Sequence, residues 1–170
     1  MLRKLCLLVL FVLMFGALIP AWAQDAGDKI ELSAGYSYMR FKSSPASDLN
    51  GFVVSGQYKL RNWLGGVAEA SGEYGKVGGV DSHVYTYVFG PQISWPRRIS
   101  PFAHVLVGAS YFTGGGFASR SFAASYGFGV DAKLKKRWSW RVVEADIVQT
   151  HLGGVSEHNT RVSTGIVFHF

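Results

Sequence analysis

The sequence predicts an all-β protein, an eight-stranded antiparallel up-and-down transmembrane β-barrel. Three observations indicate this fold class: polar and apolar residues alternate along eight segments, short and longer connections between the segments follow one another in turn, and the chain opens with an export signal. Alternation with a period of two is typical of strands, because successive side chains point to opposite faces. With 48% apolar and 16% charged residues, the composition excludes a disordered chain.

The first 23 residues have the features of a secretory signal peptide. Arg3 and Lys4 precede an apolar run of 15 residues from Leu5 to Ile19, and Ala21-Trp22-Ala23 is a small-residue cleavage site. The run is shorter than the roughly 18 to 20 residues of a spanning helix, so we expect cleavage after Ala23 and not a retained anchor. Residues 24–170 then form one outer-membrane barrel domain.

Cleavage removes the only cysteine, Cys6, and lowers the formal net charge from +6 to +4. The mature chain therefore has no cysteine for a disulfide or a thiolate metal site. Its longest basic run is Lys135-Lys136-Arg137, so we expect no binding to nucleic acid in this exported protein. No apolar stretch after Ala23 is as long as a spanning helix requires. The exported chain therefore either dissolves or enters a membrane by another route.

Strand periodicity first appears between residues 29 and 41, where one face carries Ile30, Leu32, Ala34, Tyr36 and Tyr38 and the other carries Glu31, Ser33, Gly35 and Ser37. The same alternation recurs within residues 52–60, 64–74, 85–94, 103–111, 122–134, 143–147 and 160–170. In the last segment the even positions are Val162, Thr164, Ile166, Phe168 and Phe170. Most of these segments have about 9 to 13 residues, the length that a tilted strand needs to cross a membrane.

The connections differ at the two ends of the predicted strands. Short links lie at residues 61–63, 95–98 and 135–137, whereas longer segments rich in Gly and Ser cover about residues 42–49, 75–82, 112–121 and 151–159. Tight turns at one end and longer loops at the other are typical of barrels that cross an outer membrane.

The size of the side chains on the two faces of the strands distinguishes a membrane barrel from a soluble barrel. A lipocalin-like soluble barrel points its apolar side chains inward, whereas here the bulky residues alternate with a smaller set of Gly, Ser and a few charged residues that suits a narrow interior. Aromatic residues form two predicted belts, which favours a lipid-facing exterior. One belt contains Tyr36, Tyr38, Phe52, Tyr74, Tyr85, Tyr87, Tyr111 and Phe122, and the other contains Tyr58, Trp63, Trp95, Trp138, Trp140, Phe168 and Phe170.

The final strand resembles the carboxy-terminal signal by which insertion machinery recognises outer-membrane barrels, a run of alternating apolar residues ending in Phe. The segments AGYSYMRF and RVSTGIVFHF are similar to the first and last strands of the OmpA/OmpX-like eight-stranded barrel family. The resemblance implies an outer-membrane location and an assembly signal at Val162, Thr164, Ile166, Phe168 and Phe170. It also implies contact with outer-membrane lipids and with the insertion machinery. We expect a monomer.

The predicted inward set contains a polar network in the lumen, formed by Gln57, Lys59, Glu69, His104, Asp131, Arg141, Glu144 and Asp146. Buried charges must be paired or hydrated, so we expect salt bridges and water that fill the barrel. The alternative is a narrow or gated pore whose acidic lining favours cations. A regular seventh strand would turn Arg141 toward lipid, so we predict a β-bulge around Val142 that turns Arg141 inward, opposite Asp131, and both Trp138 and Trp140 outward. The alternative is that Arg141 reaches the lipid headgroups.

Two polar triplets are candidates for the chemistry of lipid A-modifying barrels: Asp81-Ser82-His83 and Ser156-Glu157-His158. Neighbours in sequence need not converge, and a nucleophile needs a base within hydrogen-bond reach, so polar external loops are the simpler interpretation. The five histidines have no metal-ligand spacing, and FTGGGF has no following helix to cradle a phosphate. We therefore expect a non-catalytic membrane barrel without cofactor, catalytic or metal site, which has a structural or surface-interaction role.

Overall fold

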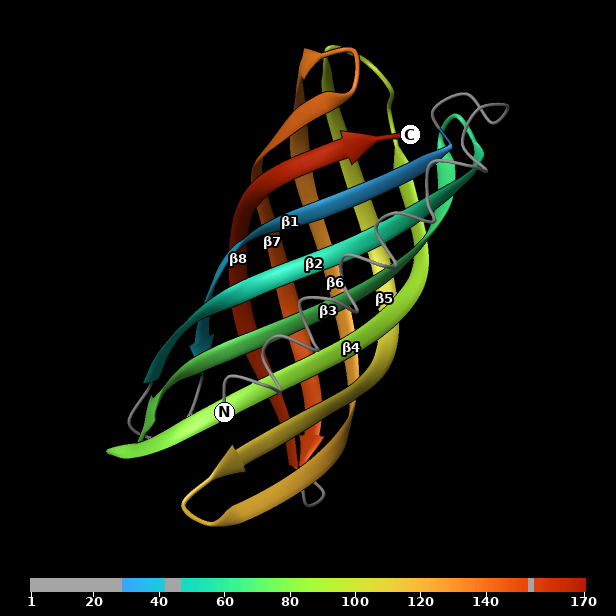
Figure 1. The fold of residues 1–170 in the computed structure, drawn as a ribbon. Coiled ribbons are helices and arrows are strands. Elements are labelled where there is room, and N and C mark those ends of the chain that lie inside the picture. The colour runs from blue at the N-terminus through green and yellow to red at the C-terminus, as the bar shows by residue number, and fades with distance from the viewer. Residues whose placement is uncertain (1–28, 42–46, 153–154) are drawn as a thin grey trace, which may run out of the picture.

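The computed structural model describes residues 29–41, 47–152 and 155–170, and it forms a closed antiparallel barrel of eight strands (Figure 1). The predicted signal peptide lies outside the described residues. The strands are β1 (Ile30–Phe41), β2 (Ser47–Arg61), β3 (Leu64–Val77), β4 (Val80–Ser94), β5 (Ile99–Gly114), β6 (Phe117–Lys135), β7 (Trp138–Leu152) and β8 (Val155–His169). The predicted fold class is confirmed.

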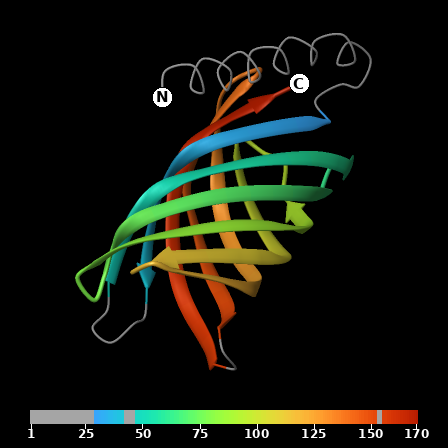
Figure 2. The same ribbon diagram turned by 60° about the horizontal axis from the view of Figure 1, so that its bottom comes forward.

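Each strand pairs with the next, and β8 pairs with β1 to close the barrel. The β1–β8 pairing runs from Glu31↔His169 to Arg40↔Thr160, and the Phe170 amide donates to the Ile30 carbonyl at 2.9 Å. In both views the strands β1–β4 cross β5–β8 at a large angle, because closing a sheet of this size requires tilted strands (Figures 1 and 2). No helix among the described residues is long and apolar enough to cross a membrane.

The predicted orientation of the side chains is confirmed. Val105, Tyr126 and Ile166 are exposed on the outer wall, whereas Glu69 and Glu144 are buried within the barrel. Both aromatic belts have exposed members: Tyr36, Phe52, Tyr74, Tyr87, Tyr111 and Phe122 lie toward one end, and Tyr58, Trp63, Trp95, Trp138 and Trp140 toward the other. The barrel therefore presents rings and branched apolar chains outward, which suits a hydrocarbon environment.

The predicted long loops over residues 75–82 and 112–121 are wrong, because the strands continue through most of those residues. Of the predicted loops 42–49 and 151–159, residues 42–46 and 153–154 lie outside the described residues, and the other residues belong to β2, β7 and β8. The strands contain 12 to 19 residues, and β3 joins β4 through Gly78 and Gly79 alone. Positive φ angles of 60° and 83° at these glycines, and of 60° and 80° at Gly115 and Gly116, form the two-residue turns that match the twist of a hairpin. The hydrogen-bonded strand pairing thus extends as hairpins beyond the aromatic belt that contains Tyr74 and Tyr111. The Gly- and Ser-rich residues there pair as strands.

The interior is less polar than the sequence predicts. One apolar cluster contains Met39, Leu49, Val84 and Val148, with Val77 and Phe112 against it, and a second contains Val67, Val88, Leu106 and Ala123. A narrow eight-stranded interior is filled by side chains, and apolar groups fill it without needing hydrogen-bond partners. The apolar clusters and the polar network therefore share the lumen.

Candidate functional site

The polar network in the lumen contains all eight of the residues predicted for it. Six of them are buried, and the other two, Lys59 and Asp131, are half-buried toward the end of the barrel where the described chain begins and ends. The structure brings most of these residues into three groups, which are centred on Arg161, on Arg141 and on Glu31.

Arg161 of β8 is the centre of the first group, and its side chain is 0% exposed. Its Nε and Nη2 donate to Asp146 Oδ2 at 3.0 and 2.8 Å, and Nη2 also donates to Glu69. Nη1 lies 4.0 Å from Glu73 Oε1, which also accepts a bond from Ser37 Oγ at 3.1 Å. One guanidinium therefore joins carboxylates from β3 and β7 across the barrel.

The strand register explains why these groups meet. His104 pairs with Gly127, Gly127 pairs with Asp146, and Asp146 pairs with Arg161, so one row of residues crosses β5 to β8. Gly127 keeps the middle of this row open, since a Cβ there would lie 1.9 Å from Asp146 Oδ1. The imidazole and the carboxylate consequently meet directly over β6.

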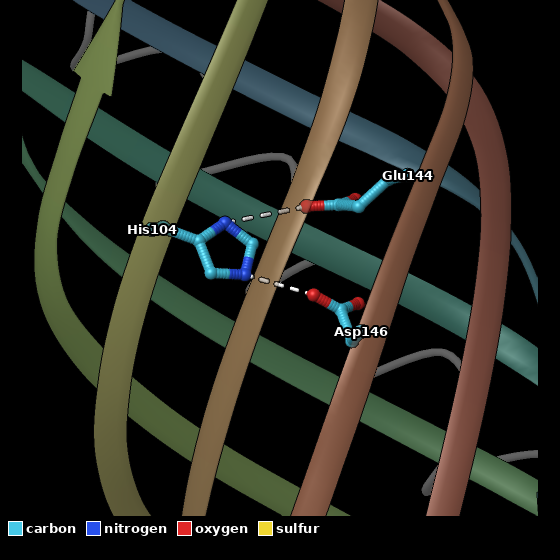
Figure 3. Close-up of side chains that lie close together, drawn as sticks. All are labelled: His104, Glu144 and Asp146. Atoms are coloured by element: carbon cyan, nitrogen blue, oxygen red, sulfur yellow. Dashed lines mark hydrogen bonds and ion pairs between the residues drawn. The ribbon is translucent and has the colours of Figure 1, made fainter.

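His104 of β5 lies between two carboxylates of β7 (Figure 3). Its Nε2 is 2.8 Å from Asp146 Oδ1, and its Nδ1 is 3.6 Å from Glu144 Oε1. Phe102 stacks on the ring at a centroid distance of 6.1 Å. Because Asp146 contacts Arg161 and Glu144 contacts Arg141, the imidazole links the first group to the second.

The second group depends on the predicted bulge at Val142. The register of β7 shifts between Arg141 and Glu144, so Val142 and Val143 both face outward. Arg141 turns inward, and its Nε and Nη2 donate to the two carboxylate oxygens of Asp131 at 2.9 and 3.1 Å. Both the bulge and the Arg141–Asp131 pair agree with the prediction, and a fork-to-fork pair of this kind is geometrically specific.

The third group lies at the mouth of the barrel next to the turns of residues 61–63, 95–98 and 135–137. Glu31 pairs with Lys59 Nζ and with His169 Nδ1, the latter at 2.7 Å. Deeper in the lumen, the Gln92 side-chain amide donates to Gln57 Oε1 at 2.9 Å.

Side chains fill the lumen at the level of these contacts, because Arg161, Glu73 and Asp146 are each at most 1% exposed. Among the described residues, five carboxylates, from Glu69, Glu73, Asp131, Glu144 and Asp146, surround two guanidinium groups and one imidazole. The network is therefore a dense plug with an excess of acidic groups.

One group of side chains among the described residues has the donor types of a metal site: His104, Glu144 and Asp146, with ligand atoms within 4.8 Å of one another. Nitrogen and carboxylate donors suit a divalent transition metal. The same atoms already contact one another, and the second oxygens of the carboxylates accept bonds from Arg141 and Arg161. We therefore assign no metal to this group.

The first polar triplet does not converge. The Ser82 side chain is buried and its Oγ donates to the Val80 carbonyl at 3.1 Å, whereas His83 faces outward with its ring 5.2 Å from that of Tyr74. The pair thus lies on opposite faces of β4 and is not a nucleophile with its base. The side chains of Ser156 and Glu157 lie outside the described set, so the second triplet stays a prediction.

Sequence reasoning missed Arg161 and Glu73 as members of the network. The strand register identifies Arg161. Leu152 pairs with Val155, and counting six residues back from Leu152 and six residues forward from Val155 pairs Asp146 with Arg161. The predicted loop over residues 151–159 hid this count, because a long loop leaves the register undefined.

No protein-family model and no curated protein matches the sequence. Solved structures do match. Neisserial surface protein A has a TM-score of 0.68 at 14% identity, with 86% of this chain and 100% of that chain covered. The attachment invasion locus protein Ail of Yersinia pestis has a TM-score of 0.57 at 16% identity, with 83% and 97% covered.

The amino-terminal β-barrel domain of Pseudomonas aeruginosa OprF has a TM-score of 0.54 at 12% identity, with 85% of this chain and 99% of that chain covered. The fold is that of the eight-stranded outer-membrane barrels. At these identities the likeness concerns the fold alone.

The residues of the predicted assembly signal lie on the outer face of β8. Val162, Thr164 and Ile166 are exposed, and Phe168 and Phe170 are half-buried. The ring of Phe168 contacts those of Trp138 and Phe170 at centroid distances of 4.7 and 4.4 Å. The alternation is as predicted, and recognition by insertion machinery stays a prediction.

Proposed function

We propose that this chain is an integral barrel of the bacterial outer membrane with a closed lumen and a structural or surface-interaction role. The main support for this proposal is the combination of two features: an apolar outer wall bordered by aromatic side chains, and a lumen filled at the level of the Arg161 group. An outer wall of this kind is stable in lipid and costly in water. Export through the predicted signal peptide and insertion through the terminal strand belong to the same proposal.

The hairpins beyond the aromatic belt are the proposed interaction surface. The β5–β6 hairpin continues past Tyr111 to Phe117, whose side chain is 79% exposed. Similarity of fold to proteins named for the cell surface and for attachment supports this choice. We also propose a monomer and a role without catalysis. In the first of the two candidate triplets, Ser82 and His83 lie on opposite faces of their strand, which supports the absence of a nucleophile there.

A cation-selective pore is the second candidate, and the excess of carboxylates over guanidinium groups in the lumen favours it. It would require the Arg161 group to open. If the Arg161 group stays closed, the barrel conducts no ions.

Two measurements on the purified full chain test the proposal. A folded membrane barrel resists detergent, so the chain should fractionate with outer membranes and change its gel mobility after boiling. In planar bilayers the closed lumen should give no steady conductance. Steady cation conductance would reject the closed lumen in favour of the pore, and extraction without detergent would reject the membrane location.

A further inference from the structure

The end of the barrel that holds the third group, formed by Glu31, Lys59 and His169, is strongly basic. Its three turns contain Arg61, Arg97, Arg98, Lys135, Lys136 and Arg137 and no acidic residue. The proposed interaction surface lies at the opposite end, so we place this end at the periplasmic side. A ring of one sign of charge around an opening focuses the electric field and concentrates counter-ions there.

A hollow of about 350 Å³ opens into the lumen at this end. Arg97, Arg98 and Lys133 lie at its edge, and Lys59, Asp131 and Phe102 line it further in. The Arg141 guanidinium lies over the Phe102 ring at 4.4 Å. The volume is at the lower end of the range for small-molecule sites, which is roughly 300 to 1,000 Å³.

Both carboxylates of the hollow already have cationic partners. Glu31 pairs with Lys59 and His169, and Asp131 pairs with Arg141. The side chains of Arg97, Arg98 and Lys133 form no hydrogen bond or ion pair with any described residue. The hollow therefore has three cationic groups whose charge no group of the described residues balances.

We propose that this hollow binds a small phosphate-bearing anion. Guanidinium groups match the geometry of phosphate oxygens in two-point contacts, and a lysine ammonium adds a point charge. The Trp63 and Trp95 side chains flank the mouth on the outer wall at the level where lipid headgroups lie. The phosphate thus comes either from a soluble compound or from a phospholipid headgroup of the adjacent leaflet.

The test uses the full chain folded in dodecyl maltoside micelles, which contain no phosphate, and titrates pyrophosphate by calorimetry at 0.15 M salt. We expect saturable binding with one site per chain. The triple variant Arg97→Gln, Arg98→Gln, Lys133→Gln should weaken it by about tenfold or more, because charge-assisted hydrogen bonds are lost.

A matched triple variant removes the same charge outside the hollow: Arg61→Gln, Lys135→Gln, Lys136→Gln. Its affinity should fall by less than about threefold, because these three side chains do not line the hollow and salt screens charges that make no direct contact with the anion. Heat-modifiable gel mobility verifies that both variants fold, and it separates a failure of this site from a failure of the barrel. Absence of saturable binding by the wild type, or an equal loss in both variants, would overturn the proposal.

A second arm identifies the source of the phosphate. The chain is placed in nanodiscs of phosphatidylglycerol, and the titration is repeated. Weaker pyrophosphate binding than in micelles assigns the hollow to lipid headgroups, and unchanged binding assigns it to a soluble anion. Both results support the site and differ only in its occupant.

Discussion

Replacing Arg161 by Met should destabilise the barrel more than any other single change in the lumen. The guanidinium is fully buried and joins three carboxylates, from Asp146, Glu69 and Glu73. Removing one partner of a buried ion pair costs about 3–5 kcal/mol, because the remaining charge stays desolvated. With three acids affected, we expect a loss of about 5 kcal/mol in the free energy of unfolding.

The three acids are not affected equally. Without Arg161, Asp146 retains His104 at 2.8 Å and Glu73 retains Ser37 at 3.1 Å, whereas Glu69 forms no other hydrogen bond or ion pair with the described residues. Adding Glu69→Gln to the Arg161→Met variant should therefore recover part of the loss, since it neutralises the carboxylate left alone. The two changes should be strongly non-additive in a double-mutant cycle.

Urea unfolding in phospholipid vesicles, followed by tryptophan fluorescence and by gel mobility, gives the free energies. A cost below about 1 kcal/mol for Arg161→Met would be the range of an exposed ion pair and would refute the buried network. Additive effects of Arg161→Met and Glu69→Gln would refute the direct coupling between the two side chains.

Three further outcomes are expected. Gly127→Val should destabilise the barrel by about 1–3 kcal/mol in the same unfolding assay because its side chain displaces the imidazole–carboxylate bond, whereas Gly66→Val, with open space around it, should be near neutral. Val105→Arg should cost about 2–4 kcal/mol in vesicles at mid-depth, and Phe117→Arg at the hairpin tip should cost little; equal costs would contradict the lipid-facing assignment. Deleting Phe170 should reduce the heat-modifiable fraction in cell membranes but not in refolding from urea, and an equal effect on both would show a role in stability instead of assembly.

The outer wall and the mouth of the barrel were predictable from the sequence because strand period two is a local signal. Alternation together with the bulk of the two faces places Val105 outside and Glu69 inside, and the short Lys135–Arg137 turn sets the Asp131–Arg141 pair and the bulge that it requires. Each inference depends on residues close in sequence, where register has little freedom.

The centre of the lumen was not predictable in the same way. Arg161 contacts Glu69, 92 residues away, so its partners depend on the register of every strand between them. The Gly-Gly turns were interpreted as parts of loops, although two consecutive glycines also fit a tight hairpin. Met39 and Val148 were missed because an inward apolar side chain breaks the alternation that defines the inner face.

The hydrogen bond from the Phe170 amide to the Ile30 carbonyl brings the two ends of the barrel wall together at one rim. A short peptide could therefore join Phe170 to Lys29, and the circle could be cut at Gly78–Gly79, where the turn is exposed. Such a circular permutant keeps every strand pairing but moves the aromatic residue away from the last position of the chain. Its spontaneous folding in detergent could then be measured separately from its delivery in the cell, which tests whether the proposed recognition of the terminal strand is independent of wall closure.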